Sequence, residues 1–262
     1  MNKSFEILVK DLKSIGLCKG DTVMVHSSLK SMGNVEGGAL TVIDALKEVL
    51  GEEGTLLFPA FSFSTSYYDN YFSYKDTPSC VGKISETFRN LDGVVRSFHP
   101  THSLSASGKN AVEITKDHYL DDTPVGVNSP LRKLPKYNGK ILMLGCTFAA
   151  NTFMHGMEEL ANVFYVLRGY QEYTMVDING NESKKQVRRH NFARPEGRLI
   201  QRYERALDVL EENVDYKLGD IHGAKSVLIN SDALEEKAVK KMKEVPTYFI
   251  DDPDGVLNKC FK

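Results

Sequence analysis

The sequence has almost no excess charge, no CxxC pair and no long apolar run. Lysine and arginine number 33 against 35 aspartates and glutamates, so no overall basic field is available to hold nucleic acid or an anionic membrane. The four cysteines are scattered along a chain too long to need disulfide staples. These absences exclude a dedicated nucleic-acid binder and a disulfide scaffold.

The apolar runs are short, and the longest of them, such as Ile141–Leu144, fall far below the roughly 20 residues of a membrane-spanning helix. No signal peptide is recognisable at the start, so we expect a cytoplasmic protein. No repeat, low-complexity tract or obvious linker interrupts the chain, which is 41% hydrophobic. We therefore predict a single domain over residues 1–262.

The apolar pattern alternates between helix and strand. It predicts helices at 4–15, 41–50, 81–89, 151–161, 197–211 and 231–245, and strands at 21–26, 55–59, 94–98, 104–106 and 140–144. Such alternation is typical of an α/β fold. Residues 173–187, broken at Asn179–Asn181, predict an inserted β-hairpin. The aromatic stretch 61–79 has no clean period and is predicted to be a long, functional loop.

His155 and Glu158 stand three residues apart on the predicted helix 151–161, so their side chains share one face. The carboxylate can orient the imidazole and stabilise its charge, which suits a general base. This helix follows the carboxyl end of the buried strand 140–144, where ligands of open α/β sheets collect. We interpret the pair as a catalytic base and its partner.

Other polar clusters favour a pocket over a metal centre. Ser27 and its neighbours lie where a strand meets a helix, a place for backbone donors to meet an anion, although no P-loop or GxGxxG motif is present. His99 and His102 have no third or fourth ligand at metal spacing, so no metal is expected. Cys146 precedes His155 by nine residues, and both a nucleophile and a buried structural thiol stay open.

Taken together, several blocks resemble the aminoglycoside 3-N-acetyltransferase family over roughly residues 5–170. The blocks are His26–Gly33, Glu36–Ala39, Thr77–Ser79, His99–Ser103, Asp122–Gly126 with Ser129–Pro130, and Leu144–Glu158. The resemblance implies a three-layer α/β/α sandwich of that family's own type, which here carries the inserted hairpin. It also implies transfer of acetyl from acetyl-CoA to a primary amine of an amino sugar, with no metal.

The resemblance implies roles for particular residues. His155 is expected to act on the amine with help from Glu158, and His102 is a weaker candidate. The expected cofactor-binding residues are Ser27, Ser28, Leu29, Lys30, Thr77 and Ser103. For the acceptor we expect the aromatic and acidic stretch to supply Tyr67, Asp69 and Asp76, because sugars stack on rings and ammonium groups favour carboxylates.

The predicted function is therefore that of an aminoglycoside N(3)-acetyltransferase, an antibiotic-resistance enzyme acting in the cytoplasm as a monomer or homodimer. Lys184, Lys185, Arg188 and Arg189 form a basic cluster that would repel a polycationic drug, and we predict that it lies away from the pocket. Three alternatives stay open. They are an N-acetyltransferase for an amino sugar of polysaccharide or natural-product biosynthesis, a covalent Cys146/His155 acyltransferase, and a non-enzymatic sugar- or CoA-binding protein.

Overall fold

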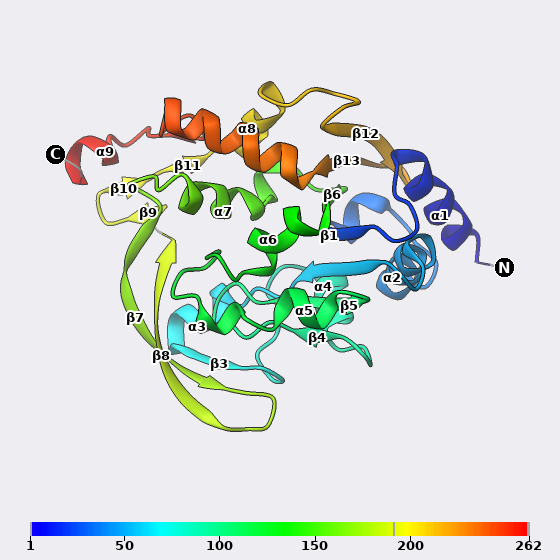
Figure 1. Cartoon of the computed structure of the whole chain (residues 1–262), viewed down its shortest axis with the longest axis horizontal. Coiled ribbons are helices and arrows are strands. Elements are labelled where there is room, and N and C mark those ends of the chain that lie inside the picture. The colour runs from blue at the N-terminus through cyan, green and yellow to red at the C-terminus, as the bar shows by residue number, and fades with distance from the viewer. Residues whose placement is uncertain (1, 191, 261–262) are drawn as a thin grey trace.

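A seven-stranded mixed sheet runs through the molecule (Figure 1), in a computed structural model that describes residues 2–190 and 192–260, with the backbone alone at 65–67. The strand order is β12-β13-β6-β1-β2-β5-β4. The central strands β6 (Lys140–Leu144), β1 (Thr22–Ser27) and β2 (Thr55–Pro59) are parallel, and their outer neighbours are antiparallel. Those neighbours are β4 (Val95–Arg96), β5 (Leu104–Gly108), β12 (Tyr216–Ile221) and β13 (Ala224–Asn230).

Helices cover both faces of this sheet. Leu142 and Leu144 of β6 pack on one side with α1 (Lys3–Ile15), α2 (Gly38–Leu50) and α4 (Lys83–Arg89). Ile141 and Met143 pack on the other side with α5 (Ala111–Thr115), α6 (Pro130–Lys133), α7 (Phe153–Leu160) and α8 (Ser231–Glu244). Because successive strand side chains point to opposite faces, both clusters form on one sheet. The predicted three-layer α/β/α architecture is confirmed.

The predicted loop at 61–79 is wrong in part, because it contains α3 (Phe63–Asp69) and β3 (Tyr71–Ser73). β3 pairs with β7 (Leu167–Val176), which pairs in turn with β8 (Glu182–His190). Phe72 is buried against hairpin side chains. This strand is therefore stabilised by a tertiary contact, and the spacing of residues in its own sequence does not indicate it. The predicted hairpin is confirmed and is longer than the sequence indicated.

The predicted helix at 197–211 is wrong. This segment forms β10 (Gly197–Arg198), which pairs with β9 (Ala193–Arg194), and β11 (Ile200–Gln201), which pairs with β14 (Ile250–Asp251). Gly197 has a φ of 139°, and a Cβ there would lie 2.4 Å from Cβ of Asp254, so the chain turns where a helix would continue. The remaining helices are α9 (Val256–Cys260) and the 3₁₀ turns η1 (Leu29–Met32), η2 (His118–Leu120), η3 (Leu134–Tyr137), η4 (Phe148–Ala150) and η5 (Tyr203–Asp208).

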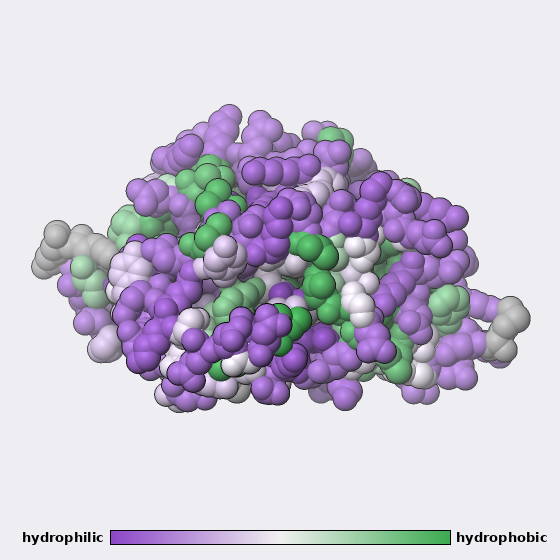
Figure 2. Space-filling view, turned by 60° about the horizontal axis from the view of Figure 1, so that its bottom comes forward, coloured by the Kyte–Doolittle hydropathy of each residue, from purple (hydrophilic) through white to green (hydrophobic). Residues whose placement is uncertain are grey.

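The surface agrees with a chain rich in charged residues. The face drawn in Figure 2 is mostly hydrophilic, and its hydrophobic residues gather in small separate patches. Across residues 2–190 and 192–260, no helix has the length and apolar character needed to cross a bilayer.

Candidate active site

The predicted base and its partner are in contact. α7 begins after β6 and a short connection containing η4, and its i, i+3 spacing brings His155 Nδ1 to 3.0 Å from Glu158 Oε2. Glu158 is fully buried, while the His155 side chain keeps 12% of its surface exposed. A buried carboxylate thus faces an imidazole that still reaches solvent.

Two tyrosines complete the environment of Glu158. Tyr203 of η5 donates its O–H to Oε2 at 2.8 Å, and Tyr165 donates to Oε1 at 3.4 Å. Burial and the nearby Glu158 carboxylate raise the pKa of Tyr203 well above its ordinary value, and burial has the same effect on the pKa of Tyr165. Both phenols therefore stay protonated and act as hydrogen-bond donors to the carboxylate.

The hydrogen bonds of His155 define its tautomer. Nδ1 faces two acceptors, the Glu158 carboxylate at 3.0 Å and the Tyr203 oxygen at 2.8 Å. Tyr203 donates its own proton to Glu158, so its oxygen accepts from Nδ1. Nε2 lies 3.3 Å from the amide nitrogen of Gln201, which is only a donor. Nδ1 therefore carries the proton, and the lone pair of Nε2 accepts the Gln201 N–H at 3.3 Å. An amine that takes the place of this long contact would meet a general base at Nε2.

His155 lines a cavity of 260 Å³ at the carboxyl ends of the central strands. β1 contributes His26 and Ser27, and β2 contributes Pro59. The remaining lining residues are Phe61, Phe63, Val81, His102, Cys146, Ala149, Ala150 and Thr152. The cavity lies where the sequence pattern indicated a ligand site.

Cys146 lies in this wall but is poorly suited to nucleophilic attack. Burial raises the pKa of its thiol to about 11, so the thiolate is scarce at neutral pH. The same residue also lines an outer groove of 950 Å³, together with Ser31, Gly145 and Lys225. Gly145 has a φ of 66°, and a Cβ there would lie 2.9 Å from Ala224 and 3.0 Å from Ser31. This glycine therefore lets the walls of the groove approach one another.

The expected cofactor-binding residues separate into two groups. Ser27 lines the cavity, Ser28 accepts a hydrogen bond from Ser31 on its hydroxyl at 2.9 Å, Leu29 packs against the α1 and α2 layer, and Lys30 is exposed. Of these four residues only Ser27 lines the cavity, and the next residue along the chain, Ser31, lines the groove.

Thr77 and Ser103 lie elsewhere, buried around the guanidinium of Arg96. Ser103 accepts from Arg96 Nε at 2.9 Å, and the Thr77 carbonyl accepts from Nη1 at 2.7 Å. Their hydroxyls bond to Ala60 O and to the Ser73 amide, and neither residue lines the cavity. A structural role in holding Arg96 explains both positions.

Two of the expected acceptor residues, Asp69 and Asp76, do not line the cavity. Asp69 and Asp76 are exposed, with Asp69 accepting from the Tyr71 amide and Asp76 from the Ser73 hydroxyl. The Tyr67 side chain lies outside the described part of the chain. Phe61 and Phe63 from the same stretch do line the cavity, with ring centroids 5.0 and 5.8 Å from that of His102. The aromatic wall is therefore built from the start of this segment.

Buried imidazoles extend inward from the cavity. His102 lines it, while His99 is fully buried and stacks on His118 with ring centroids 4.7 Å apart. Burial lowers the pKa of His99 and His102 well below the ordinary range, that of His118 to about 3 and that of His26 to about 4. These rings are neutral. In the described chain, no group of three or more His, Cys, Asp or Glu side chains is placed to hold a metal ion.

The basic cluster of the hairpin is held by the hairpin itself and by a neighbouring loop. Lys184 is exposed and pairs with Glu172 at 2.8 Å, and Arg188 lies over the Tyr170 ring at 6.0 Å. Arg189 donates to Tyr173 at 2.5 Å, whereas half-buried Lys185 reaches the Tyr119 carbonyl. None of the four lines the cavity. The charge of Lys185 helps to lower the pKa of His99 and of His118.

Several site residues were not identified from the sequence. Tyr165, His190, Gln201 and Tyr203 all touch His155 or Glu158. Gln201 and Tyr203 lie in the segment that was wrongly predicted as helix. No spacing in the sequence links them to α7, because these contacts span between 7 and 48 residues.

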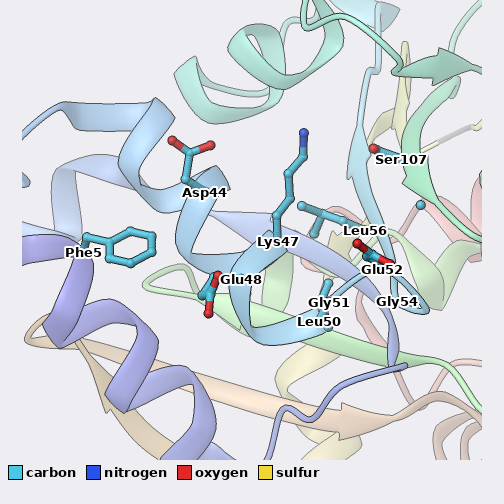
Figure 3. Close-up of a pocket in the computed structure, with 11 residues that line it drawn as sticks. Phe5, Asp44, Lys47, Glu48, Leu50, Gly51, Glu52, Gly54, Leu56 and Ser107 are labelled. Carbon is cyan, nitrogen blue, oxygen red and sulfur yellow. The ribbon is translucent and has the colours of Figure 1, made fainter.

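A second cavity, of 530 Å³, lies at the other end of β2 (Figure 3). Gly54, Leu56, Ser107 and Gly108 line it beside α2, whose side chains Asp44, Lys47 and Glu48 are drawn in the figure. Its lining holds neither a histidine nor a cysteine. The cavity at His155 is therefore the candidate active site.

Comparison with known proteins gives a single family. The model of the aminoglycoside 3-N-acetyltransferase family matches residues 24–243. Aminoglycoside N(3)-acetyltransferase VII of Streptomyces paromomycinus is 38% identical in an alignment 175 positions long, which covers 59% of this chain and 60% of that enzyme. Aminoglycoside N(3)-acetyltransferase IV of a Salmonella species is 29% identical over 96% of this chain and 92% of that enzyme.

Solved structures agree with this assignment. AAC-IIIb in a binary complex with CoASH superposes with a TM-score of 0.78, at 26% identity over 92% of this chain and 96% of that one. A variant of AAC(3)-IVa in complex with gentamicin superposes with a TM-score of 0.79, at 27% identity over 95% and 92% of the two chains. The fold is therefore shared along nearly the whole length.

Proposed function

The chain belongs to the aminoglycoside 3-N-acetyltransferase family, and we propose that it transfers acetyl from acetyl-CoA to a primary amine, the 3-amino group, of an aminoglycoside. The observation that carries this proposal is the contact of His155 with Glu158 at the wall of the cavity. Glu158 and Tyr203 accept from Nδ1, and Nε2 at the wall of the cavity acts as the base once an acceptor amine replaces its 3.3 Å contact with Gln201. We assign the activity to a single domain over residues 1–262, acting in the cytoplasm as a monomer or homodimer.

The reaction needs proton transfers that His155 can perform. A neutral acceptor amine attacks the thioester carbonyl, and Nε2 of His155 takes a proton from the nitrogen as the N–C bond forms. When the C–S bond breaks, the same proton passes from His155 to the leaving thiolate. The products are the amide and CoA thiol. Glu158 stabilises the transient imidazolium, and its two phenol donors hold its side chain in place.

The outer groove suits the acetyl donor. Cys146 lines both the groove and the inner cavity, so a thioester lying in the groove has a route toward His155. Ser31 and Lys225 supply a hydroxyl and a cation for phosphates, and Lys30 lies exposed on the same 3₁₀ turn as Ser31. We therefore propose Ser27–Lys30 as the part of β1 and η1 that contacts acetyl-CoA, without Thr77 or Ser103.

The acceptor side is proposed at the aromatic wall. Phe61 and Phe63 offer ring faces on which a sugar can stack, and α3 starts at Phe63. Asp69 at the end of α3 lies about 9 Å further along the helix axis, close enough to attract an ammonium group of a polyamine. Tyr67 belongs to the same helix, so we include it in the proposed acceptor site. Asp76 bonds to Ser73 within its own turn, so we leave it out of the site.

The test is release of CoA thiol from acetyl-CoA in the presence of single acceptors. One set contains aminoglycosides with and without a free 3-amino group, and a second contains neutral and anionic amino sugars. We expect turnover, and a mass gain of one acetyl, only for acceptors with the 3-amino group. Turnover of anionic amino sugars alone would replace this function with a biosynthetic one, and CoA binding without turnover would indicate a binding protein.

A further inference from the structure

A second histidine–carboxylate pair lies directly beside the first. Glu159 follows Glu158 on α7, and its Oε1 lies 3.2 Å from Nε2 of His190, the last residue of β8. Both side chains are 7% exposed. Glu159 also accepts from the Thr123 hydroxyl at 2.5 Å and from the Val125 amide at 3.0 Å. This carboxylate is therefore anchored on three sides.

The two imidazoles are in contact and tilted against each other. The ring centroids of His155 and His190 are 4.0 Å apart, and the ring planes meet at 33°. Burial and the neighbouring His155 lower the pKa of His190 well below its ordinary range, so His190 is neutral. With Nε2–H donated to Glu159, its π-face is available to His155. A neutral ring can stabilise an imidazolium stacked upon it, whereas a second cation would repel it.

The base of the hairpin fixes the position of His190. The Arg188 amide donates to the Asp122 carbonyl at 2.8 Å, and the Tyr170 hydroxyl donates to the Asp122 carboxylate at 2.6 Å. Asp122 directly precedes Thr123, which holds Glu159. The loop at 122–125, the hairpin and α7 (Figure 1) thus meet around the two imidazoles.

We propose that His190, anchored by Glu159, is a positioning residue that fixes the ring plane of His155 and stabilises its charged form during acetyl transfer. This proposal rests on the proposed function, because it assigns His155 as the base. His190 donates no proton to substrate in this scheme. The other aromatic rings that face the pair are His102, with its centroid 4.9 Å from that of His190, Phe192 at 5.3 Å from His155, and Tyr203 at 5.4 Å.

The kinetic test compares three substitutions in the full chain. His190→Ala removes ring and hydrogen bond, His190→Phe keeps the stacked ring, and His190→Gln keeps a donor for Glu159. We expect His190→Ala to lower kcat about 10-fold with KM for both substrates changed less than about 2-fold, because a misaligned base costs rate and not binding. His190→Phe should recover most of that loss, and His190→Gln should recover less.

The matched control is His222→Ala, which removes a histidine bonded to Met32 O and to Ser4, outside this cluster. A wild-type kcat in His190→Ala, or a rise in KM alone, overturns the proposal. If His190→Ala does not fold, the comparison of His190→Phe with His190→Gln decides, and equal kcat values in these two overturn it as well.

A readout independent of turnover separates this proposal from the proposed function. In protein labelled with ¹⁵N-histidine, we expect the Nδ1–H resonance of His155 to be sharp in wild type and in His190→Phe, and broadened in His190→Gln, where the stacked ring is missing. An unchanged resonance in His190→Gln overturns the positioning role. If wild-type protein acetylates no amine, the proposed function fails, while this resonance still shows whether His190 orients His155.

Discussion

Tyr203 donates its phenol proton to Oε2 of Glu158 across 2.8 Å, although 45 residues separate the two in sequence. Both side chains are buried, so this bond forms away from competing water. We expect Tyr203→Phe to lower kcat about 10-fold, since loss of one such bond is worth about 1.4 kcal/mol in the transition state.

Steady-state kinetics with a verified acceptor check this, and Tyr216→Phe on β12 is the control. Unchanged kcat in Tyr203→Phe would mean that Glu158 needs no support from η5.

The base itself makes a stronger prediction. Replacing His155 by Ala removes the acceptor for the amine proton, so turnover should fall about 100-fold or more. Acetyl-CoA affinity should change little, because the proposed donor groove is lined by other residues. Calorimetric titration with CoA and a thiol-release assay measure the two effects separately. A variant that keeps near wild-type turnover would remove His155 from the mechanism.

Cys146 tests the direct route against a covalent one. Burial raises the pKa of this thiol to about 11, so we expect Cys146→Ala to keep most of the activity. Rapid-mixing kinetics of wild type should show no burst of CoA thiol before acceptor is added. An acetylated Cys146 peptide trapped by mass spectrometry would establish the covalent enzyme instead.

The buried histidines predict how stability depends on pH. The pKa of His26 is lowered to about 4 and that of His118 to about 3, against about 6.5 in an unfolded chain. Between these values the unfolded chain binds protons that the native protein does not, so the free energy of unfolding decreases as pH falls below about 6.5. Each such histidine contributes a slope of up to about 1.4 kcal/mol per pH unit.

Urea unfolding at a series of pH values from about 7 to about 5 measures this slope. His118→Asn should reduce it, because one titrating group is lost. A free energy of unfolding that stays constant over that range would contradict the burial of neutral histidines.

The spacing of apolar residues predicted those helices and strands that have a clear apolar face or an unbroken apolar run. β6 is a continuous apolar run ended by Gly145, and α7 shows a helical apolar face, so both elements and the contact of His155 with Glu158 followed from spacing. β12 and β13 were missed, because β13 mixes polar and apolar residues and is defined by pairing with β6. The same limit explains the failure at 197–211, where β11 depends on β14.

The residues of the site divide in the same way, into those that spacing predicts and those that depend on tertiary contacts. His155, Glu158 and Ser27 lie on or directly after elements that the sequence predicts, so their meeting at one edge of the sheet was foreseeable. His190 is an isolated histidine at the end of a hairpin strand, and nothing in its neighbours indicates a partner on α7. Contacts between distant segments depend on how layers pack, which periodicity does not describe.

Arg96 gives the last prediction, which concerns stability. The residue is 5% exposed, and its guanidinium donates to the carbonyls of Ala60, Tyr74 and Thr77 and to the Ser103 hydroxyl, at 2.7 to 3.0 Å. The group also lies 4.6 Å from the centre of the Phe72 ring.

Arg96→Met keeps much of the volume but leaves buried acceptors without donors, so we expect the free energy of unfolding to fall by about 3 kcal/mol or more. Arg198→Met, at an exposed position, should cost less than about 0.5 kcal/mol. Urea unfolding of both variants measures the difference. Equal stability of the two would show that water replaces the guanidinium, and that the turn at 73–77 does not depend on Arg96.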